Sequence, residues 1–374
     1  MKKVFGIIFL RIADLGTIAI SLLYLASLTV PYIDNDKYWM VSVLALGFPF
    51  LLAGMVAATL FWVMLWSRRA WICLAVLLLG YQQIGAAIAF NMPKKFVVEK
   101  PQGTLRVMQW NVHNWNQIKF PGERELDDYA QPEMMNLIRR YDADILCLEE
   151  FFEGVNPKKY ISNVEVLKAM GYRYYYFLND GIHDRQYYAG IAVFSKFPVA
   201  DGKSVEVATG ININPVASAM VDVNGRQVRV FAVHLESVRF EQDDYQNLDK
   251  MKESRGREVN GGKVVLSKLR TGFVNRRSQA EAINREVEST TTPVIVCGDF
   301  NDVPNSRTYF TVRQNLNDAF ISKGTFIGRT FRFISPTLRI DYILPSKDFE
   351  VEQCRVIRAN YSDHYPVIAD LRLK

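Results

Sequence analysis

The stretch Thr292-Pro-Val-Ile-Val-Cys-Gly-Asp-Phe-Asn-Asp302 decides the fold of this chain. A proline precedes the short apolar run 294–297, and this pattern predicts a strand that is buried on both faces. The run stops at Gly298 and is followed by Asp299 and Asn301 in one polar turn. A carboxylate and a carboxamide held on a rigid element suit a hard cation and a phosphate oxygen. The simpler interpretation is a polar turn that ends a core strand and has no further role.

Other apolar runs, from distant parts of the chain, also have polar groups at their ends. Each such residue alone is more often structural than functional. Together they are the groups that phosphoester hydrolysis requires: acids for a metal ion, amides for phosphate oxygens and imidazoles for protons. The candidate site residues are Asn111, Glu150, His234, Asp299, Asn301, Asp341, Asp363 and His364.

Strands and helices alternate in the first part of the globular region, and a hairpin then interrupts the order. Helical periodicity is present at 132–141, 164–170 and 273–288. Asn224-Gly225 between two apolar runs predicts the hairpin, because both residues tolerate positive φ. This order favours two sheets packed face to face with helices outside, rather than one doubly wound sheet. The charged stretch 239–269 is expected to form a loop with a helical piece beside the site.

Three apolar stretches open the chain, at 12–33, 39–66 and 70–90. Each has about the 20 residues that a helix needs to cross a bilayer. None has the small-residue cleavage pattern of a signal peptide, so we expect a retained anchor. The expected organisation is three transmembrane helices in residues 1–91, a linker at 92–103 and a catalytic domain at 104–374.

Loop charges predict the orientation of this anchor. Lys2, Lys3 and Arg11 precede the first stretch, and Arg68 and Arg69 lie between the second and third. The positive-inside rule then places the N-terminus in the cytoplasm and the catalytic domain outside. The expected location is a bacterial inner membrane with the domain on the periplasmic side. Two lysines after the third stretch count against this orientation.

Composition narrows the class of protein only slightly. The chain has 374 residues, 49% of them hydrophobic, and a formal net charge of +6, which fits a phosphorylated substrate or an anionic membrane surface. Its four cysteines lack metal-type spacing, and Cys147 and Cys297 lie in predicted core strands. No long basic stripe with interleaved aromatic residues indicates a nucleic-acid groove. Arg276 and Arg277 are either substrate contacts or part of a solvated helix face.

Six short motifs occur in the order found in a known family: Trp-Asn-Val at 110–112, Asp-Ile-Leu-Cys-Leu-Glu-Glu at 144–150, His-Leu-Glu-Ser at 234–237, Gly-Asp-Phe-Asn-Asp at 298–302, Ile-Asp-Tyr-Ile-Leu at 340–344 and Ser-Asp-His-Tyr-Pro-Val at 362–367. With them the chain resembles the endonuclease/exonuclease/phosphatase superfamily of DNase I-like enzymes over about residues 104–374. The resemblance implies a four-layer α/β/β/α sandwich and metal-dependent cleavage of a phosphate ester.

The resemblance also implies roles for single residues. Glu150 would be the principal Mg²⁺ ligand, with Asn111 beside it and Asp363 close to the ion; Mn²⁺ is a possible substitute. Asp299 would orient or deprotonate the attacking water, and Asn301 would hold a phosphate oxygen. The family usually has Gln where this chain has Glu149, which leaves open whether both carboxylates reach the metal. The remaining roles are charge stabilisation by His234, acid–base or phosphate-binding work by His364, and orientation of that ring by Asp341.

Three functions follow from these patterns. The first is a membrane-anchored phosphodiesterase that acts on a phosphorylated lipid head group or a similar substrate. The second is a membrane-tethered nuclease acting on DNA or RNA, and the third is a non-catalytic membrane-bound binding module. No protein partner is predicted, and the partners are the bilayer and the phosphate-ester substrate.

Overall fold

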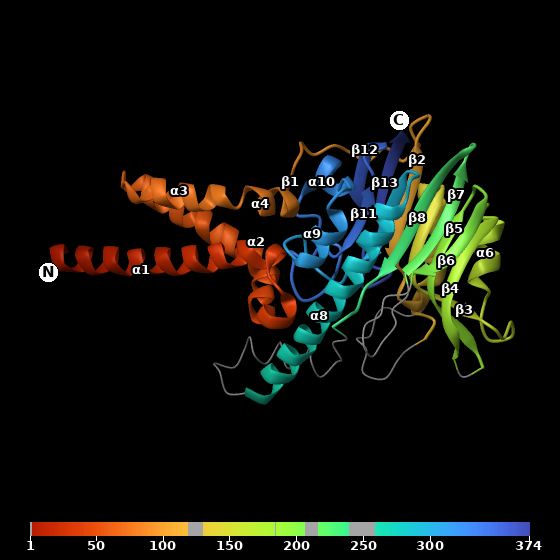
Figure 1. Cartoon of the computed structure of the whole chain (residues 1–374), viewed down its shortest axis with the longest axis horizontal. Coiled ribbons are helices and arrows are strands. Elements are labelled where there is room, and N and C mark those ends of the chain that lie inside the picture. The colour runs from red at the N-terminus through yellow and green to blue at the C-terminus, as the bar shows by residue number, and fades with distance from the viewer. Residues whose placement is uncertain (1, 119–129, 184, 206–215, 239–258) are drawn as a thin grey trace.

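The protein is described by a computed structural model. Helices at the N-terminus extend away from a body of two packed sheets (Figure 1). Of the predicted charged loop, residues 239–258 lie outside the described residues, and the remainder belongs to a helix. The described residues are 2–118, 130–183, 185–205, 216–238 and 259–374.

The N-terminal segment is entirely helical up to residue 87, apart from short turns. Two of its helices, α1 and α2, are long and apolar enough to cross a membrane. The third predicted stretch is a pair of shorter helices, α3 and α4, bent by 61° at a break between them, so it forms a third span only if the bent pair counts as one. The elements are α1 (Lys2–Thr29), η1 (Val30–Tyr32), α2 (Asn35–Met64), α3 (Arg69–Leu79) and α4 (Tyr81–Ala87).

One sheet has six strands in the order β12-β13-β2-β3-β5-β4. Strands β2 and β3 are parallel neighbours, and the other neighbouring pairs are antiparallel. The strands are β2 (Leu105–Asn111), β3 (Ile145–Gly154), β4 (Tyr174–His183), β5 (Tyr187–Ser195), β12 (Phe349–Val356) and β13 (Val367–Leu373).

The other sheet has five strands in the order β11-β9-β8-β7-β6. Strands β8 and β9 are parallel, and the predicted hairpin joins β7 to β8 through Asn224 and Gly225. The strands are β6 (Val199–Val205), β7 (Val216–Val223), β8 (Arg226–His234), β9 (Val294–Asp299) and β11 (Asp341–Pro345).

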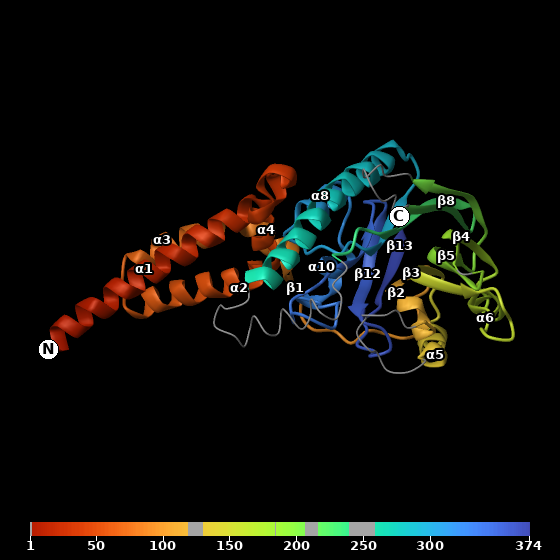
Figure 2. The same ribbon diagram turned by 90° about the horizontal axis from the view of Figure 1, so that it is seen from below.

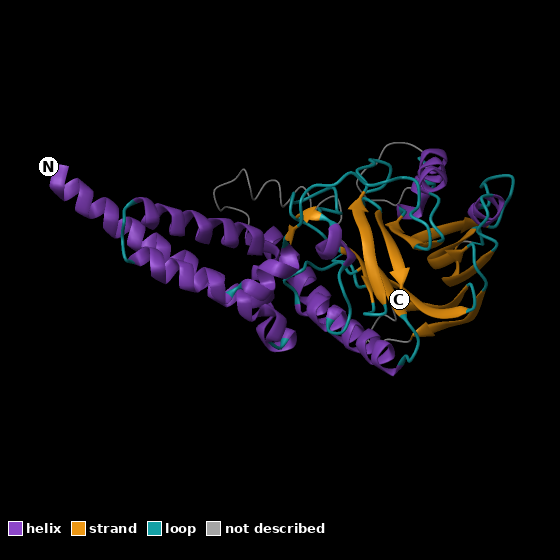
Figure 3. Ribbon diagram, turned by 90° about the horizontal axis from the view of Figure 1, so that it is seen from above, coloured by secondary structure: helices purple, strands orange, loops and turns teal. Residues whose placement is uncertain are grey.

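Helices cover the outer face of each sheet, so the body has four layers (Figure 3). Alternate residues of the strands fill an apolar layer between the sheets. Met134 of α5 and Leu167 of α6 pack on the six-stranded sheet, while Ile283 of α8 and Val312 of α9 pack on the five-stranded one. The predicted sandwich is therefore confirmed. The helices are α5 (Gln131–Tyr141), α6 (Asn163–Ala169), α8 (Val259–Ser289), α9 (Arg307–Arg313) and α10 (Ala319–Lys323), with the short η2 (His113–Asn116) after β2.

The helical segment is attached to the sheets by more than the chain itself. Directly after α4, strand β1 (Ala89–Phe90) pairs with β10 (Thr325–Phe326). The predicted linker 92–103 has no helix or strand, but it is held to the domain: the Lys100 ammonium lies 2.6 Å from the Asp144 carboxylate, and Val97 exchanges hydrogen bonds with the Gln353 amide. Figure 2 shows α8 running obliquely from beside this segment to the sheets.

Candidate active site

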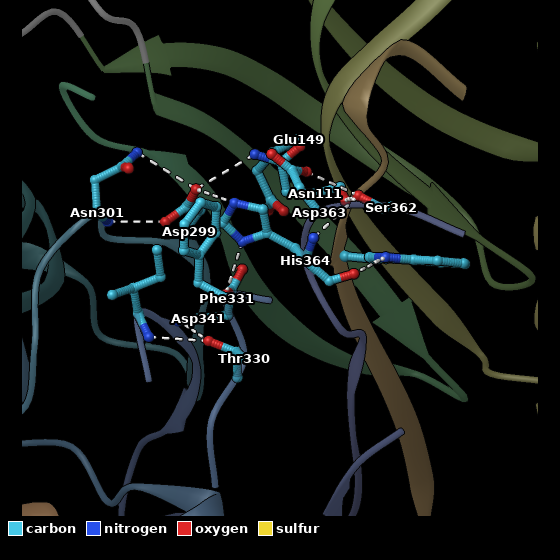
Figure 4. A network of polar contacts seen from close by, with 12 residues as sticks. Asn111, Glu149, Asp299, Asn301, Thr330, Phe331, Asp341, Ser362, Asp363 and His364 are labelled. Carbon is cyan, nitrogen blue, oxygen red and sulfur yellow. Dashed lines mark hydrogen bonds and ion pairs between the residues drawn. The ribbon is translucent and has the colours of Figure 1, made fainter. Parts of the chain in front are cut away.

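Strand alternation brings the polar strand ends together. On β2, Leu105 and Val107 face the layer between the sheets, so Gln109 and Asn111 face it as well. The same period places His234, Asp299 and Asp341 on the inner faces of their strands. All of these ends meet at one edge of the sandwich, where few apolar side chains remain to fill the layer. The result is a polar cluster with members from both sheets (Figure 4).

Asp299 lies at the centre of this cluster and is buried. One oxygen, Oδ1, accepts a hydrogen bond from the backbone N of Asn301 at 2.8 Å. The other, Oδ2, faces the side-chain amides of Asn111 and Asn301, each at 3.3 Å. Asn301 has a φ of 50°, and its amide also donates to the Leu235 carbonyl at 3.0 Å. This left-handed turn explains how a carboxylate and an amide from one short loop can point to the same place.

His364 links the two sheets. Its Nδ1 lies 2.9 Å from Oδ2 of Asp341, and its Nε2 lies 3.6 Å from Oδ2 of Asp299. The Phe331 ring packs against the imidazole with its centroid 5.0 Å away. Because a carboxylate only accepts hydrogen bonds, Asp341 fixes the proton on Nδ1 and leaves Nε2 facing Asp299.

Glu150 reaches the site through an irregularity in its strand. Alternation along β3 places Glu149 between the sheets, and Glu150 would then point away from them. The register of β3 against β5 shifts between Leu148 and Phe151, and Glu150 has a φ of 50°. This bulge turns the side chain back to the site, where Oε1 accepts a hydrogen bond from the Asn111 amide at 3.0 Å.

Two further histidines face Glu150. Nε2 of His234 lies 3.8 Å from Glu150 Oε1 and 3.9 Å from Asp299 Oδ2. Nδ1 of His113 lies 3.9 Å from Glu150 Oε2. These separations exceed hydrogen-bond length, so the rings and the carboxylates face one another without a hydrogen bond between these atoms.

Asp363 joins the cluster through Ser362. The Ser362 hydroxyl lies 2.8 Å from the Asn111 carbonyl and 3.1 Å from Oδ1 of Asp363, and it accepts a hydrogen bond from the His364 backbone N at 3.2 Å. One serine therefore ties the Asp363-His364 segment to the end of β2.

Glu149 is separate from Glu150 and fully buried. Its Oε2 accepts a hydrogen bond at 2.8 Å from the side-chain amide of Gln109, which also donates to Oδ1 of Asp341 at 2.9 Å. Its resolved hydrogen-bond partner is therefore a buried amide, whereas Glu150 is one-third exposed and faces three other site residues.

Burial and neighbouring charges change the acidity of these groups. Burial alone would lower the pKa of His364, but the carboxylates of Asp341, Asp299 and Asp363 raise it well above its usual value. Burial raises the pKa of Asp299 to about 6, with His364 opposing this rise. Burial, together with Cys147 and Asp341, raises the pKa of Glu149 well above its usual range. These shifts favour the protonated forms of the His364 ring and the Glu149 carboxyl group.

The donor groups fit a hard divalent cation. Among the described residues, the hydrogen bond resolved at the Glu150 carboxylate is the one from Asn111, which leaves oxygen lone pairs for an ion. Carboxylate and amide oxygens dominate the cluster, as Mg²⁺ or Mn²⁺ prefers. Asp299, Asp341 and His364 form a second possible group, with one ligand atom from each within 4.8 Å of the others. Asp299 belongs to this second group and also contacts Asn111 of the first, so the two groups lie in one small region.

The structure places all eight predicted residues in this region, and sequence reasoning missed several of their neighbours. His113 was not among the candidate residues, but it faces Glu150. Gln109, Ser362 and Phe331 were not singled out, although the first two lie two residues from Asn111 and His364. Alternation on β2 was the signal that pointed to Gln109.

The prediction for the two arginines of α8 needs correction. Arg276 is neither a substrate contact nor solvated: it is buried, bonded to the Glu236 carbonyl at 2.9 Å and 3.3 Å from the Asp302 carboxylate. Arg277 is paired with Asp34 and Glu281. Both side chains therefore hold the helix to its neighbours.

Comparisons with known proteins agree with this geometry. The family model described as Endonuclease/Exonuclease/phosphatase family matches residues 108–364, more than half of the chain, and a domain of unknown function (DUF8431) matches residues 8–87. A search of curated proteins found no match. Among solved structures, an endonuclease/exonuclease/phosphatase from Beutenbergia cavernae DSM 12333 has 22% identity and a TM-score of 0.51, covering 73% of this chain and 72% of that one.

Two further similar structures are the human Nocturnin catalytic domain with bound sulfate anion and TDP2 from C. elegans. The first has 19% identity and a TM-score of 0.48, and covers 74% of this chain and 96% of that one. The second has 16% identity and a TM-score of 0.46, with coverage of 73% and 76%. The match of the family model, over a region that contains every polar residue of the site, leads to one conclusion: the chain belongs to the endonuclease/exonuclease/phosphatase family.

Proposed function

We propose that the chain is a membrane-anchored, divalent-metal-dependent phosphodiesterase that acts on a phosphorylated lipid head group or a similar substrate. Family membership supports a phosphoester hydrolase. The two long apolar helices fit membrane anchoring. The metal, the diester and the lipid substrate are proposed from the side chains of the site and from its position beside the apolar helices.

One observation favours a substrate at the membrane: the residues that directly follow Asp299 and Asn301 pack against the apolar helices. Val303 packs with Val30, which directly follows α1, and with Ala45 of α2. Two residues later, the Asn305 amide donates to the Ser27 carbonyl at 3.0 Å. A head group at the bilayer surface would thus be close to the site, at a high effective concentration.

The charges of the helical segment support the predicted orientation. The α1–α2 junction contacts the catalytic domain, whereas Arg68, just before α3, and Arg69, the first residue of α3, follow the opposite end of α2. Figure 1 shows that this end of α2 points away from the two sheets. Asp34 at the near end pairs with Arg277 of α8. The basic turn would face the cytoplasm and the catalytic domain the periplasm, under the positive-inside rule. We further propose residues 1–91, 92–103 and 104–374 as anchor, connection and catalytic domain.

The side chains divide the reaction between them. Glu150, Asn111 and Asp363 would hold Mg²⁺ or Mn²⁺, which when bound would neutralise charge on the phosphoryl oxygens. Asp299 would orient the attacking water and accept its proton, because its carboxylate lies at the centre of the cluster. Asn301 would exchange its 3.3 Å contact with Asp299 for a phosphate oxygen.

The histidines would act on the phosphate and the leaving group. His234 stands beyond hydrogen-bond length from both Glu150 and Asp299, which leaves its ring to donate to a phosphate oxygen. His364, oriented by Asp341 at 2.9 Å, would donate a proton to the leaving oxygen or bind phosphate.

The test uses the full chain in lipid nanodiscs, first stripped of metal with EDTA and then given Mg²⁺ or Mn²⁺. The substrates are bis-p-nitrophenyl phosphate, p-nitrophenyl phosphate, plasmid DNA, and vesicles of phospholipid with sphingomyelin. We expect metal-dependent cleavage of the diester and of lipid, with DNA intact. Nicking of DNA at a comparable rate would instead support the tethered nuclease. Metal binding without turnover of any substrate would contradict an enzyme with this substrate range and favour the binding module.

A further inference from the structure

Gln109 is a buried polar residue at the border between the apolar core and the polar cluster of the site. Its neighbours on the inner face of β2, Leu105 and Val107, belong to the core between the sheets. The Gln109 side chain is completely buried. A buried amide in such a place costs free energy unless its hydrogen bonds are made, so its partners indicate its role.

Both donors of this amide are used by carboxylates. Nε2 lies 2.8 Å from Oε2 of Glu149 and 2.9 Å from Oδ1 of Asp341. An amide NH₂ has two hydrogens, one for each of these oxygens. Glu149 lies on β3 of the six-stranded sheet, next to β2, whereas Asp341 lies on β11 of the five-stranded sheet. The amide therefore spans the space between the two sheets.

Asp341 connects Gln109 to His364 through hydrogen bonds to its two carboxylate oxygens. Asp341 uses Oδ1 for Gln109 and Oδ2 for His364 Nδ1, at 2.9 Å in both cases. With one oxygen held on each side, the carboxylate cannot rotate about its Cβ–Cγ bond without losing a hydrogen bond. His364 comes from the segment before β13, in the sheet opposite Asp341, so its position depends on this link across the sheets.

We propose that Gln109 is a positioning residue for the hydrolysis: its amide ties Asp341 to Glu149 across the two sheets and so fixes the carboxylate that orients His364. The inference rests on the roles proposed above for Asp341 and His364. Glu149 acts as the anchor of the amide and not as a metal ligand, which gives this departure from the family's usual Gln a structural purpose. Figure 4 shows Glu149, Asp341 and His364 around the same cluster.

The kinetic test is Gln109→Met in the full chain, because methionine has a similar length but no donor. We expect kcat for bis-p-nitrophenyl phosphate to fall about 10- to 100-fold, as for other residues that act through a catalytic group, with KM within about twofold of the parent. The matched control is Gln131→Met in α5: Gln131 is also buried and donates to the Asn163 side chain at 3.0 Å, outside the site. Its kcat should stay within about twofold of the parent. An equal fall in both variants, or a parental kcat in Gln109→Met, would overturn the proposal.

A second readout does not depend on turnover. The chain has four histidines, so ¹⁵N-histidine labelling gives a simple NMR spectrum, in which His364→Asn assigns the Nδ1–H that donates to Asp341. In Gln109→Met this resonance should shift or be lost, while the Mn²⁺ titration midpoint of Glu149→Gln should match the parent. An unchanged resonance, or a weaker Mn²⁺ affinity in Glu149→Gln, would contradict the inference even if no substrate were cleaved.

Gln109→Asn covers the case in which the methionine variant does not fold. It keeps an amide but is one methylene shorter, so it cannot reach both carboxylates. The same loss of the His364 resonance is expected, and retention of that resonance in a folded Gln109→Asn chain would overturn the proposal. Loss of the resonance in a chain inactive on every substrate would leave the positioning inference standing and remove only the proposed reaction.

Discussion

At the scale of single residues, Asp299 is the group on which the site converges. It accepts hydrogen bonds from the two asparagines and lies within 4 Å of two histidine nitrogens. Its carboxylate is buried, so its charge and orientation are set by these neighbours and not by bulk water. A change of one atom in this side chain should therefore affect the chemistry far more than the fold.

Asp299→Asn tests that expectation. The amide has nearly the same shape but cannot accept a proton from water, so kcat should fall by about 10² to 10⁴. Steady-state kinetics on the chromogenic diester measures the fall, and circular dichroism checks that the variant is folded. A folded variant with parental kcat would show that Asp299 is not the base.

Glu150→Gln should weaken metal binding. Replacing a charged ligand oxygen by an amide is expected to cost at least about tenfold in Mn²⁺ affinity, measured by isothermal titration calorimetry or electron paramagnetic resonance. Glu153→Gln is the matched control, since Glu153 is three residues further along β3 and caps α6 through Ser162 and the Val164 backbone N. Glu153→Gln should lower the stability of the chain without changing its affinity for Mn²⁺. A weaker Mn²⁺ affinity in Glu153→Gln, with parental affinity in Glu150→Gln, would show that Glu150 is not a metal ligand.

The candidate residues were visible in the sequence because each follows or begins an apolar run, while their contacts were not. The Glu150 side chain points into the site because of a β-bulge and a positive φ. The residue types at 148–151 do not predict either feature. Gln109 and Asp341 are 232 residues apart in the sequence and lie on strands of different sheets. Only the packing of the two sheets brings them together.

At the scale of elements, the parallel pair β8–β9 fixes the distance between His234 and Asp299, which are register partners. Gly298 allows this pairing. It has a φ of 151°, and a Cβ there would lie 1.9 Å from the Val233 carbonyl oxygen. The strands can approach at this point only because residue 298 has no side chain.

Gly298→Ala should therefore destabilise the fold by more than about 3 kcal/mol, because backbone must move in addition to the strain of the φ angle. Gly225→Ala is the control: it also has a positive φ, of 87°, but a Cβ there meets no atom within 4 Å, so only about 1 kcal/mol is expected. Urea unfolding monitored by tryptophan fluorescence compares the two. Equal losses of unfolding free energy in the two variants would show that the contact with Val233 does not add to the cost of the Cβ at residue 298.

The strands with buried apolar runs were predictable, and the polar edge strand was not. In β6 (Val-Ala-Asp-Gly-Lys-Ser-Val) most side chains are exposed, so the sequence lacks an apolar alternation. β6 pairs with β7 at the edge of the sheet, and no apolar pattern in the sequence of β6 predicts this pairing. Likewise, hydropathy identifies the third apolar stretch, but it does not reveal the 61° bend between α3 and α4.

At the scale of the whole molecule, the helical segment and the catalytic domain form one packed unit. The buried Arg339 is paired with Asp318 at 2.6 Å, and its other Nη donates to the Ala86 carbonyl of α4 at 2.7 Å. The Arg307 guanidinium donates to the Ile33 carbonyl at 2.9 Å. With the apolar contact between Val303 and Val30, these bonds hold the site loop against the helices.

A chain lacking residues 1–91 should consequently be less stable than the full chain, with a lower thermal midpoint in differential scanning fluorimetry. Arg339 and Arg307 would each lose a hydrogen bond to a carbonyl, at about 1.5–3 kcal/mol for a bond to a charged group. The control is Glu165→Gln in the full chain, which breaks the exposed Glu165–Lys168 pair on α6 of the catalytic domain and should leave the midpoint nearly unchanged. A shortened chain with the parental midpoint would mean that the two parts are independent.

Metal-dependent phosphoester hydrolysis at the membrane can be followed by ³¹P NMR of liposomes that hold the full chain. When Mg²⁺ is added after EDTA, we expect a lipid phosphorus resonance to decline and a water-soluble or newly exposed phosphate resonance to grow. Liposomes with the Asp299→Asn chain should show neither change. Unchanged lipid resonances with Mg²⁺ bound, while plasmid DNA added to the same liposomes is cleaved, would contradict this proposal.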